Sequence, residues 1–213
     1  MEKQNLVSNI LDGLDRLGAT ARADDWAAAE ATELTPTQAG ILIYLKRRAP
    51  ARLQQVAGHL AVSLPSASAS VEALVRKKLV IRRKDASDAR ARALELSGEG
   101  KAMVQRLTRQ PSRLRAVVAA MPAAEQADFF LHIVMVVRAL QVSGAIPVQR
   151  LCVTCAHFRP FAHAASDAPH HCALVNAAFG TRDLRIDCAE HQDADPAART
   201  AIWTAFNKGD ASS

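Results

Sequence analysis

Apolar residues recur every three or four positions along most of residues 6–143. The first such stretch, residues 6–31, predicts a long helix, because residues at this spacing share one helical face. Thr35 and Pro36 are typical of a helix start, as N-cap and first helical residue, and Pro50 ends that second helix. The apolar face of the first helix is formed by Leu6, Ile10, Leu14 and Leu17.

Two shorter helical patterns follow, over residues 52–60 and 64–78, with a tight turn between them and Ser63 as the cap of the second. A β-prone run begins at Leu79, residues 85–88 have turn chemistry, and residues 90–96 alternate in polarity. The pattern predicts a helix, a turn, a second helix and then a β-hairpin.

Two further helices are expected, one over residues 98–120 and one that begins near Pro122 and is apolar over more than one stripe. Such a helix is either deeply buried or part of an intersubunit bundle. A break at 144–147 marks our predicted domain boundary. Residues 151–191 lack clear periodicity, and residues 195–206 read as a short amphipathic tail helix before a frayed end.

The predicted fold class is mainly α with a small β-hairpin wing: a winged helix-turn-helix lobe, a helical domain and a small Cys-rich module. The sequence is 49% hydrophobic but only 4% aromatic, so its core must be built largely from Ala, Leu and Val, and Ala and Leu favour helices. The predicted parts are a first helix (1–34), a winged helix-turn-helix lobe (35–97), two further helices (98–143), a Cys-rich module (148–192) and a tail (193–213).

Charge is placed unevenly along the chain. Residues 1–150 carry 22 Lys and Arg against 14 Asp and Glu, whereas residues 151–213 carry 5 against 7. The first part is therefore the candidate for a polyanionic partner. Between Arg76 and Arg92 lie eight basic and two acidic residues, which a hairpin can present to phosphates or to a minor groove. A charge run taken alone is more often a solvated face.

The helix over 64–78 has a slim first half rich in hydroxyl groups, as a helix that enters the major groove requires. An ordinary surface helix has the same appearance, so this feature gains weight only beside the basic hairpin. The candidate DNA-binding residues are Ser66, Ser68, Ser70, Arg76, Arg82, Arg83, Lys84, Asp88, Arg90 and Arg92.

These residues resemble the signature of the MarR family of transcriptional regulators over roughly residues 5–142. The resemblance is carried by Leu74, Leu79-Val80, Arg82-Arg83, Asp88-Ala89-Arg90, Leu94-Glu95-Leu96-Ser97 and Gly100, with Ser97 where Thr is more usual. It implies a homodimer bound to a palindromic operator in double-stranded DNA. Residues 35–97 would then form the DNA-binding lobe, and residues 1–34 and 98–143 the dimerisation helices. It further implies that Asp88 braces the wing, that Arg90 meets the minor groove, and that a small molecule such as an aromatic acid acts as an effector.

All four cysteines lie between positions 152 and 188: Cys152 and Cys155 form a CxxC, and Cys172 and Cys188 follow singly. Such clustering indicates metal binding or redox chemistry more than disulfides. We favour an iron–sulfur cluster slightly over Zn²⁺, since zinc sites usually have two CxxC knuckles, and place a metal-free thiol switch third. The module resembles Cys-rich extensions of some MarR-like proteins.

Five of the seven histidines lie in the same segment. His170 or His171 could replace Cys172 as a ligand. His171 and Asp187 are also candidates to form hydrogen bonds with the ligands without binding the metal. For His157 and His163 we expect surface or packing roles.

The sequence therefore predicts a DNA-binding transcriptional regulator, not an enzyme, whose affinity is modulated by the Cys site. One alternative is an iron–sulfur redox protein or enzyme on a helical scaffold, although no catalytic dyad, phosphate loop or dinucleotide motif is present. Another is a MarR-like regulator with a structural zinc and a small-molecule effector. The chain has no apolar leader, and apolar runs such as Ile133–Val137 are too short for a membrane span, so we expect a cytoplasmic protein.

Overall fold

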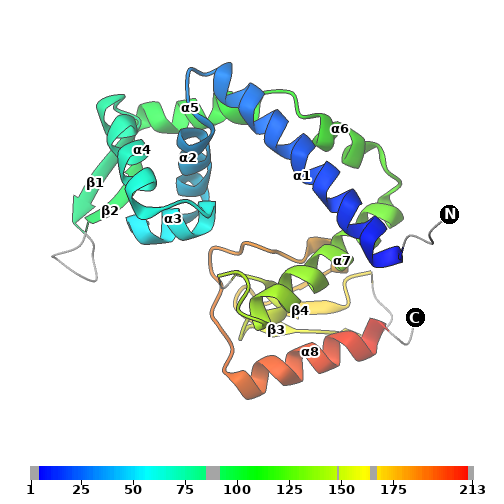
Figure 1. Cartoon of the computed structure of the whole chain (residues 1–213). Helices are drawn as coiled ribbons and strands as arrows, with labels where there is room; N and C mark the ends of the chain where they lie inside the picture. The colour runs from blue at the N-terminus through cyan, green and yellow to red at the C-terminus, as the bar shows by residue number, and fades with distance from the viewer. Residues whose placement is uncertain (1–4, 85–91, 148, 164–166, 211–213) are drawn as a thin grey trace. The chain divides into compact units, whose positions relative to one another are not determined.

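The computed structural model describes residues 5–84, 92–147, 149–163 and 167–210, and it divides into two compact units, Met1–Ala120 and Met121–Ser213 (Figure 1). Unit 1 contains six helices and a two-stranded antiparallel sheet among its described residues: α1 (Leu6–Glu30), α2 (Pro36–Arg48), α3 (Leu53–Leu60), α4 (Leu64–Arg76), β1 (Val80–Lys84), β2 (Arg92–Leu96), α5 (Gly98–Thr108) and α6 (Arg113–Ala120). This order confirms the predicted winged helix-turn-helix.

The helix starts of unit 1 are set locally by side-chain caps. At α2, Thr35 Oγ1 accepts from the backbone N–H of Gln38 at 3.2 Å, and Gln38 Oε1 accepts from the backbone N–H of Thr35 at 3.4 Å. At α4, Ser63 Oγ accepts from the backbone N–H of Ser66 at 3.3 Å. Each cap satisfies a donor that the first turn leaves unpaired, so both predicted starts are confirmed.

Helix α2 forms the centre of the first core. Its Ile41, Leu42 and Leu45 are almost fully buried against residues of α3, α4 and both strands. The wing is attached to this core through Leu94, which exchanges two backbone hydrogen bonds with Ala51, of 3.2 and 2.8 Å. The partners that complete the buried cluster include Val56, Val71, Leu74, Val80, Leu96 and Val104.

The wing joins α5 through a tight junction at Ser97. The Ser97 hydroxyl accepts from the backbone N–H of Gly100 at 2.9 Å and donates to the carbonyl of Lys78 at 2.6 Å, while the Ser97 N–H donates to the carbonyl of Leu79 at 3.1 Å. A Cβ on Gly100 would overlap the Leu79 carbonyl oxygen, so no larger residue fits there without movement. The Ser97 and Gly100 of the sequence signature thus serve one structural purpose.

The predicted single helix over 98–120 is wrong, because it breaks into α5 and α6 around Pro111. The start of α6 is held by Asp24 of α1, whose buried carboxylate accepts from Ser112 Oγ at 2.9 Å, Arg113 Nε at 2.8 Å and the backbone N–H of Leu114 at 3.2 Å. The Arg113 hydrogen bond is the main cause that lowers the pKa of Asp24. Proline at this point removes a helical donor, and Asp24 satisfies the new helix start.

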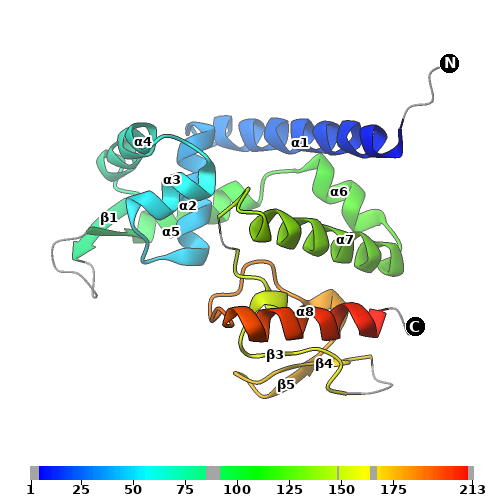
Figure 2. The same ribbon diagram turned by 60° about the horizontal axis from the view of Figure 1, so that its bottom comes forward.

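Unit 2 combines two helices with a small sheet. Its described elements are α7 (Ala123–Val142), the short 3₁₀ turns η1 (Cys152–Thr154) and η2 (Thr181–Asp183), the strands β3 (Phe158–Arg159), β4 (His170–Cys172) and β5 (Ala177–Phe179), and α8 (Pro196–Asp210). The strands form an antiparallel sheet in the order β3-β4-β5, with α8 lying along it (Figure 2). This sheet was not predicted, because strands of two or three residues are too short to show a period.

A second core holds unit 2 together and includes α7. Val134 of α7 is 1% exposed and packs with Val153 and Phe158 of the cysteine segment and with Phe206 of α8. Our predicted boundary at 144–147 therefore differs from the observed division, which falls after Ala120 and groups α7 with the cysteines. Periodicity predicted that α7 is apolar on several sides but not which partner covers it. No helix within the described parts of the chain has the length and hydropathy that a membrane span requires.

The Asp24 cap leads to a prediction about acid stability. We expect Asp24→Asn to lower the thermal midpoint at neutral pH, because the ionised carboxylate holds Ser112, Arg113 and the start of α6. Folding lowers the pKa of Asp24. The stabilisation by its ionised carboxylate is therefore fully present above the ordinary pKa of about 4, and it is lost as the pH falls through the lower pKa of the folded protein. The difference in midpoint between the proteins should therefore shrink in acid.

Thermal melts across pH test this, with Asp12→Asn, an exposed position on the same helix, as the matched control. A deficit that is equal at neutral and acidic pH would contradict a role for the charge of Asp24.

Candidate functional site

The exposed side of α4 begins with small side chains. Ser66 is exposed, its hydroxyl lies 2.8 Å from that of the cap Ser63, and Ala69 is exposed one turn later. Ser68 and Ser70 are half-buried, because the next residues on their side of the helix, including Val71, face the core. Of the three predicted serines, Ser66 is thus the most exposed, and the outer face of α4 near its start carries small side chains.

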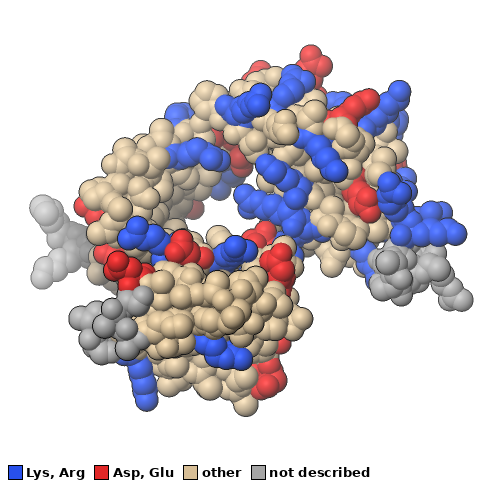
Figure 3. Space-filling view, turned by 180° about the vertical axis from the view of Figure 1, so that it is seen from behind, with Lys and Arg blue, Asp and Glu red and all other residues tan. Residues whose placement is uncertain are grey.

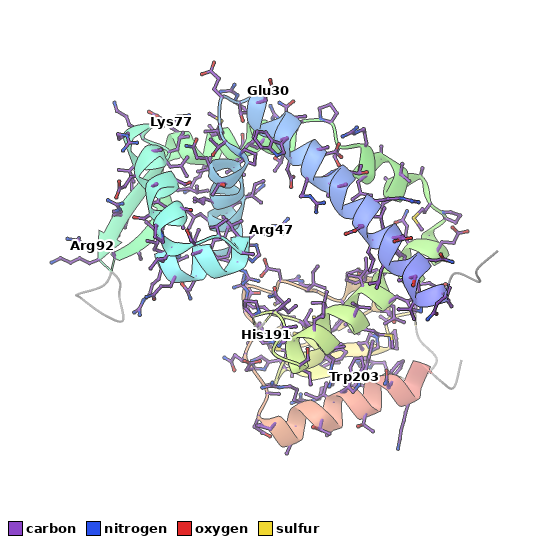
Figure 4. All side chains as sticks on the ribbon, viewed as in Figure 1. Glu30, Arg47, Lys77, Arg92, His191 and Trp203 are labelled. Atoms are coloured by element: carbon purple, nitrogen blue, oxygen red, sulfur yellow. The ribbon has the colours of Figure 1, made fainter. Side chains whose placement is uncertain are left out.

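Cationic side chains line the wing. Arg82, Arg83 and Lys84 of β1 and Arg92 of β2 are all exposed. The Arg83 Nε lies 3.1 Å from Glu95 Oε2 on the opposite strand, although 63% of the Arg83 side chain stays exposed. Figure 3 shows Lys and Arg side chains beside the free end of this hairpin, and in Figure 4 the Arg92 side chain extends away from β2.

The strand register adds an electrostatic cost to the wing. Lys84 pairs directly with Arg92 across β1 and β2. Like charges placed directly opposite in an antiparallel pair destabilise it, and nearby anions relieve the repulsion. Arg76, at the end of α4, is exposed as well. The predicted Asp88 and Arg90 lie outside the described residues.

In unit 2, the two ends of the cysteine segment are held together by the backbone. The N–H of Cys152 donates to the carbonyl of Arg185 at 2.9 Å, and the N–H of Cys188 donates to the carbonyl of Arg150 at 3.1 Å. The side chains of Arg150 and Asp187 form an ion pair of 2.7 Å across the same junction. Asp187, which we expected to support a ligand, therefore fixes the fold beside Cys188.

All four cysteines face one cavity of about 210 Å³. Cys152 and Cys155 stand at the ends of the η1 turn, which closes with a hydrogen bond from the N–H of Cys155 to the carbonyl of Cys152 at 2.9 Å. Cys172 comes from the end of β4, between Phe158 and Ala177 of the neighbouring strands. The fold thus gathers the four predicted ligands, which lie up to 36 positions apart in the sequence, around a common space.

The chemistry of the cavity depends on its burial. Burial raises the pKa of the Cys152 thiol to about 11, the backbone N–H of Arg185 opposes this by donating to Cys152 Sγ at 3.2 Å, and the other three cysteines raise it further. The Cys188 thiol donates to Glu190 Oε2 at 3.4 Å. No three His, Cys, Asp or Glu side chains in the described parts of the chain are grouped tightly enough to hold a single metal ion.

The histidines divide into distinct roles. His157, for which we expected a surface or packing role, lines the cavity, and its buried Nε2 has no hydrogen-bond partner among the described residues. His171 lies 3.2 Å from His163, nitrogen to nitrogen, and is not among the residues that line the cavity. The sequence did not indicate which histidines would line the cavity. His170 and His171 face opposite sides because they are neighbours on β4, and that strand was not predicted.

His170 is not placed as a ligand, contrary to one of our sequence alternatives. It is fully buried, its Nδ1 accepts from the backbone N–H of Phe161 at 3.3 Å, and its Nε2 lies 3.1 Å from Thr181 Oγ1. Burial lowers the pKa of His170 to about 4, so it is neutral and belongs to the core. The rings that surround it are those of Phe158, Phe161, Phe179 and Phe206.

Comparison with known proteins agrees with the fold of unit 1. Residues 32–91 match the sequence model of the MarR family. A MarR transcriptional regulator from Methanosarcina mazei Go1 is 16% identical with a TM-score of 0.54, over 62% of this chain and 97% of that one. Staphylococcus aureus MarR in complex with salicylate and kanamycin is 17% identical with a TM-score of 0.54, over 65% and 93%.

The PcaV transcriptional regulator from Streptomyces coelicolor, solved in complex with its natural ligand, is 26% identical with a TM-score of 0.50, over 65% of this chain and 99% of that one. No curated protein matches the chain. Unit 1 therefore has the MarR-type winged-helix fold. Since each neighbour is covered almost completely by about two thirds of this chain, the chain carries a further segment that these three structures lack.

Proposed function

We propose that the protein is a homodimeric DNA-binding transcriptional regulator whose affinity for DNA depends on a metal centre held by its four cysteines. The observation that carries the DNA-binding part is the exposed cationic hairpin of a winged-helix lobe that matches the MarR family. The metal-dependent part is supported by the arrangement of all four cysteines around one cavity.

DNA phosphates are the partner that the wing chemistry fits. Lys84 and Arg92 repel each other in the free protein, which destabilises the wing. A DNA phosphate near them would offset this repulsion. Ser66 at the start of α4 can donate to phosphate oxygens or base edges. Arg90 and Asp88, which lie between β1 and β2 in the sequence, take the minor-groove and bracing roles that the family resemblance implies.

A salt titration of DNA binding tests this proposal. We expect wild-type affinity for duplex DNA to fall steeply with salt, because cations on the protein replace counterions on the phosphates. Arg82→Ala and Arg92→Ala should each weaken binding and reduce the slope of log affinity against log salt by about 0.9 for each phosphate that the variant no longer neutralises. Arg90→Ala should weaken binding as well.

The matched control is Arg182→Ala, which removes the same charge from an exposed position in unit 2. Fluorescence anisotropy with a labelled duplex gives the affinities. Wild-type protein whose DNA binding is absent or independent of salt would overturn the DNA-binding role and favour the redox alternative.

A second copy of the chain is the partner that α1 fits. Its apolar residues lie 39–71% exposed along the helix, which is unusual for a surface that remains in water. Those between Leu6 and Leu17 recur at helical spacing, so they form a continuous stripe that a two-fold axis could pair with itself, whereas Trp26 lies outside this stripe. The exposed apolar residues are Leu6, Val7, Ile10, Leu11, Leu14, Leu17 and Trp26.

Charge placed on this stripe should dissociate the dimer. We expect Ile10→Glu combined with Leu14→Glu to give a monomer, since two carboxylates would face an apolar interface. Ser8→Glu, on the polar side of the same helix, should leave the dimer intact. Sedimentation velocity distinguishes the two species. Wild-type protein that is monomeric at the concentrations where it binds DNA would contradict the proposed dimer.

The core of unit 2 offers a route from the cysteines to the dimer. Phe130, Val134 and Val137 of α7 pack in the same cluster as Val153 and Cys155, so the state of the cavity acts on the packing of α7. The outer residues of α7 are exposed, with Phe129 at 37%, Val136 at 53% and Leu140 at 41%, and only two residues separate α7 from α6. A change in the cysteine site can therefore reach surfaces available to a second copy.

Removal of the metal tests this coupling. We expect the stripped protein to differ from the loaded protein in DNA affinity by about 5- to 150-fold, the usual range of coupling between two sites. Cys172→Ser combined with Cys188→Ser should match the stripped protein and no longer respond to a chelator. Equal DNA affinity in the loaded and stripped states would overturn the coupling and favour a structural site with a small-molecule effector.

A further inference from the structure

We propose that Glu72 makes α4 selective for DNA sequence, by accepting a hydrogen bond from the amino group of a cytosine in the major groove. The inference deepens the DNA-binding part of the proposed function and rests on it. It comes from the charge of the lobe, the outward face of α4 and the lack of a partner for this carboxylate among the described residues.

Glu72 is the one acidic residue in a strongly basic stretch of the sequence. Residues 34–84 contain ten Lys and Arg against this single carboxylate. Such a stretch attracts phosphates whatever the base sequence, and a carboxylate brought near the phosphates weakens that attraction. On the surface that meets DNA, Glu72 therefore opposes non-specific binding, and this cost needs a compensating contact with the correct bases.

The side chain of Glu72 lies on the outward face of α4. From Ser66 onward, every third or fourth residue of the helix is exposed, whereas Val71 and Leu74 on its other side are buried. The exposed residues are Ser66, Ala69, Glu72 and Arg76. The second helix of a helix-turn-helix lies in the major groove, and α4 adjoins the wing (Figure 1), so this face is the one that meets base edges.

The Glu72 carboxylate is available to a ligand. It has no hydrogen bond or ion pair among the described residues, although Arg76 stands one helical turn further along, at a spacing that permits a pair. A pair between these two side chains would explain Glu72 as an ordinary surface residue. Since they do not form one in the part of the chain that the structure describes, both keep their charges for other partners.

The donors that the major groove offers to a carboxylate are few. Cytosine presents only its N4 amino group, a donor, whereas guanine and thymine present acceptors and adenine places its donor N6 beside the acceptor N7. An ionised carboxylate only accepts hydrogen bonds, so it fits cytosine best and is repelled by guanine and thymine. Glu72 thus selects by excluding wrong bases as well as by binding the right one.

The length of this helix face matches a short run of bases. Ser66 and Glu72 are six positions apart, which is about 9 Å along a helix that rises 1.5 Å per residue. Base pairs follow each other at about 3.4 Å, so the face spans nearly three of them. Ala69, between the two, has only a methyl group and lets the helix approach the base edges.

Selection of binding sites from a pool of duplexes with a randomised centre tests this proposal with the full-length protein. We expect the wild type to fix a cytosine at one position of each half-site, and replacement of that cytosine to weaken binding by about 5- to 150-fold, the usual cost of one wrong base pair. Glu72→Gln should select adenine there, because an amide pairs with N6 and N7 of adenine. Glu72→Ala should select no base at that position.

Glu99→Gln is the matched control, since it removes the same charge from an exposed position on α5 and should leave the selected motif unchanged. Far-UV circular dichroism checks that each variant folds. A motif that is the same in wild type, Glu72→Ala and Glu72→Gln would overturn the role of Glu72. So would a Glu72→Ala protein that binds the selected duplex and an unrelated duplex with equally reduced affinity, since that result indicates a purely structural role.

The inference and the proposed function fail in different ways. A wild-type protein that enriches no duplex and whose DNA binding is absent or independent of salt would overturn the DNA-binding function, and this inference with it. A wild-type protein that enriches a motif which neither Glu72 variant alters would leave that function intact and overturn this inference alone.

Discussion

Ser97 fixes the winged-helix lobe, because it joins three elements within a few residues. Its hydroxyl and its backbone N–H donate to the carbonyls of Lys78 and Leu79, just after α4, and its hydroxyl caps α5 through Gly100. The root of the wing is therefore anchored to the segment that follows α4. A rigid root matters because Lys84 and Arg92 repel each other further along the hairpin. Without the anchor, the strands would relieve this repulsion by separating.

In unit 2, the neutral, fully buried side chain of His170 lies within an aromatic core. His170 lies among phenylalanine rings from β3, β5 and α8, and both ring nitrogens have hydrogen-bond partners. This core leaves the cysteines along one wall of the module, where four thiols share a cavity with His157. The two histidines differ in their hydrogen bonding. Both ring nitrogens of His170 have partners inside the fold, whereas Nε2 of His157 has none among the described residues.

Helix α7 belongs to the same unit as the cysteines and follows α6 of unit 1 directly in the sequence. One side of α7 is buried by Val134 in the cysteine core, and residues such as Val136 on its outer side are exposed. A helix with two apolar sides needs two partners, and unit 2 supplies only one. The stability of the module and the surface that α7 offers to a second chain therefore depend on the same helix.

Local rules were sufficient for unit 1. The capped starts at Thr35 and Ser63, the helical spacing of the apolar residues and the turn chemistry after Lys84 each act within a few residues, so the sequence alone determined the winged helix-turn-helix and its basic wing. It also singled out the four cysteines, the only ones in the chain, and the structure places all four around one cavity. The break at Pro111 was missed, because its compensation comes from Asp24, almost ninety positions away.

Tertiary structure decided the rest. The strands of unit 2 are too short to have a period, and pairing between distant segments selects which of His157, His170 and His171 faces the cysteines. The assignment of α7 to the cysteine module also depends on packing, because the sequence of an apolar helix does not indicate which partner buries it. The sequence thus determined which groups are available for binding, and long-range packing determined which of them share a site.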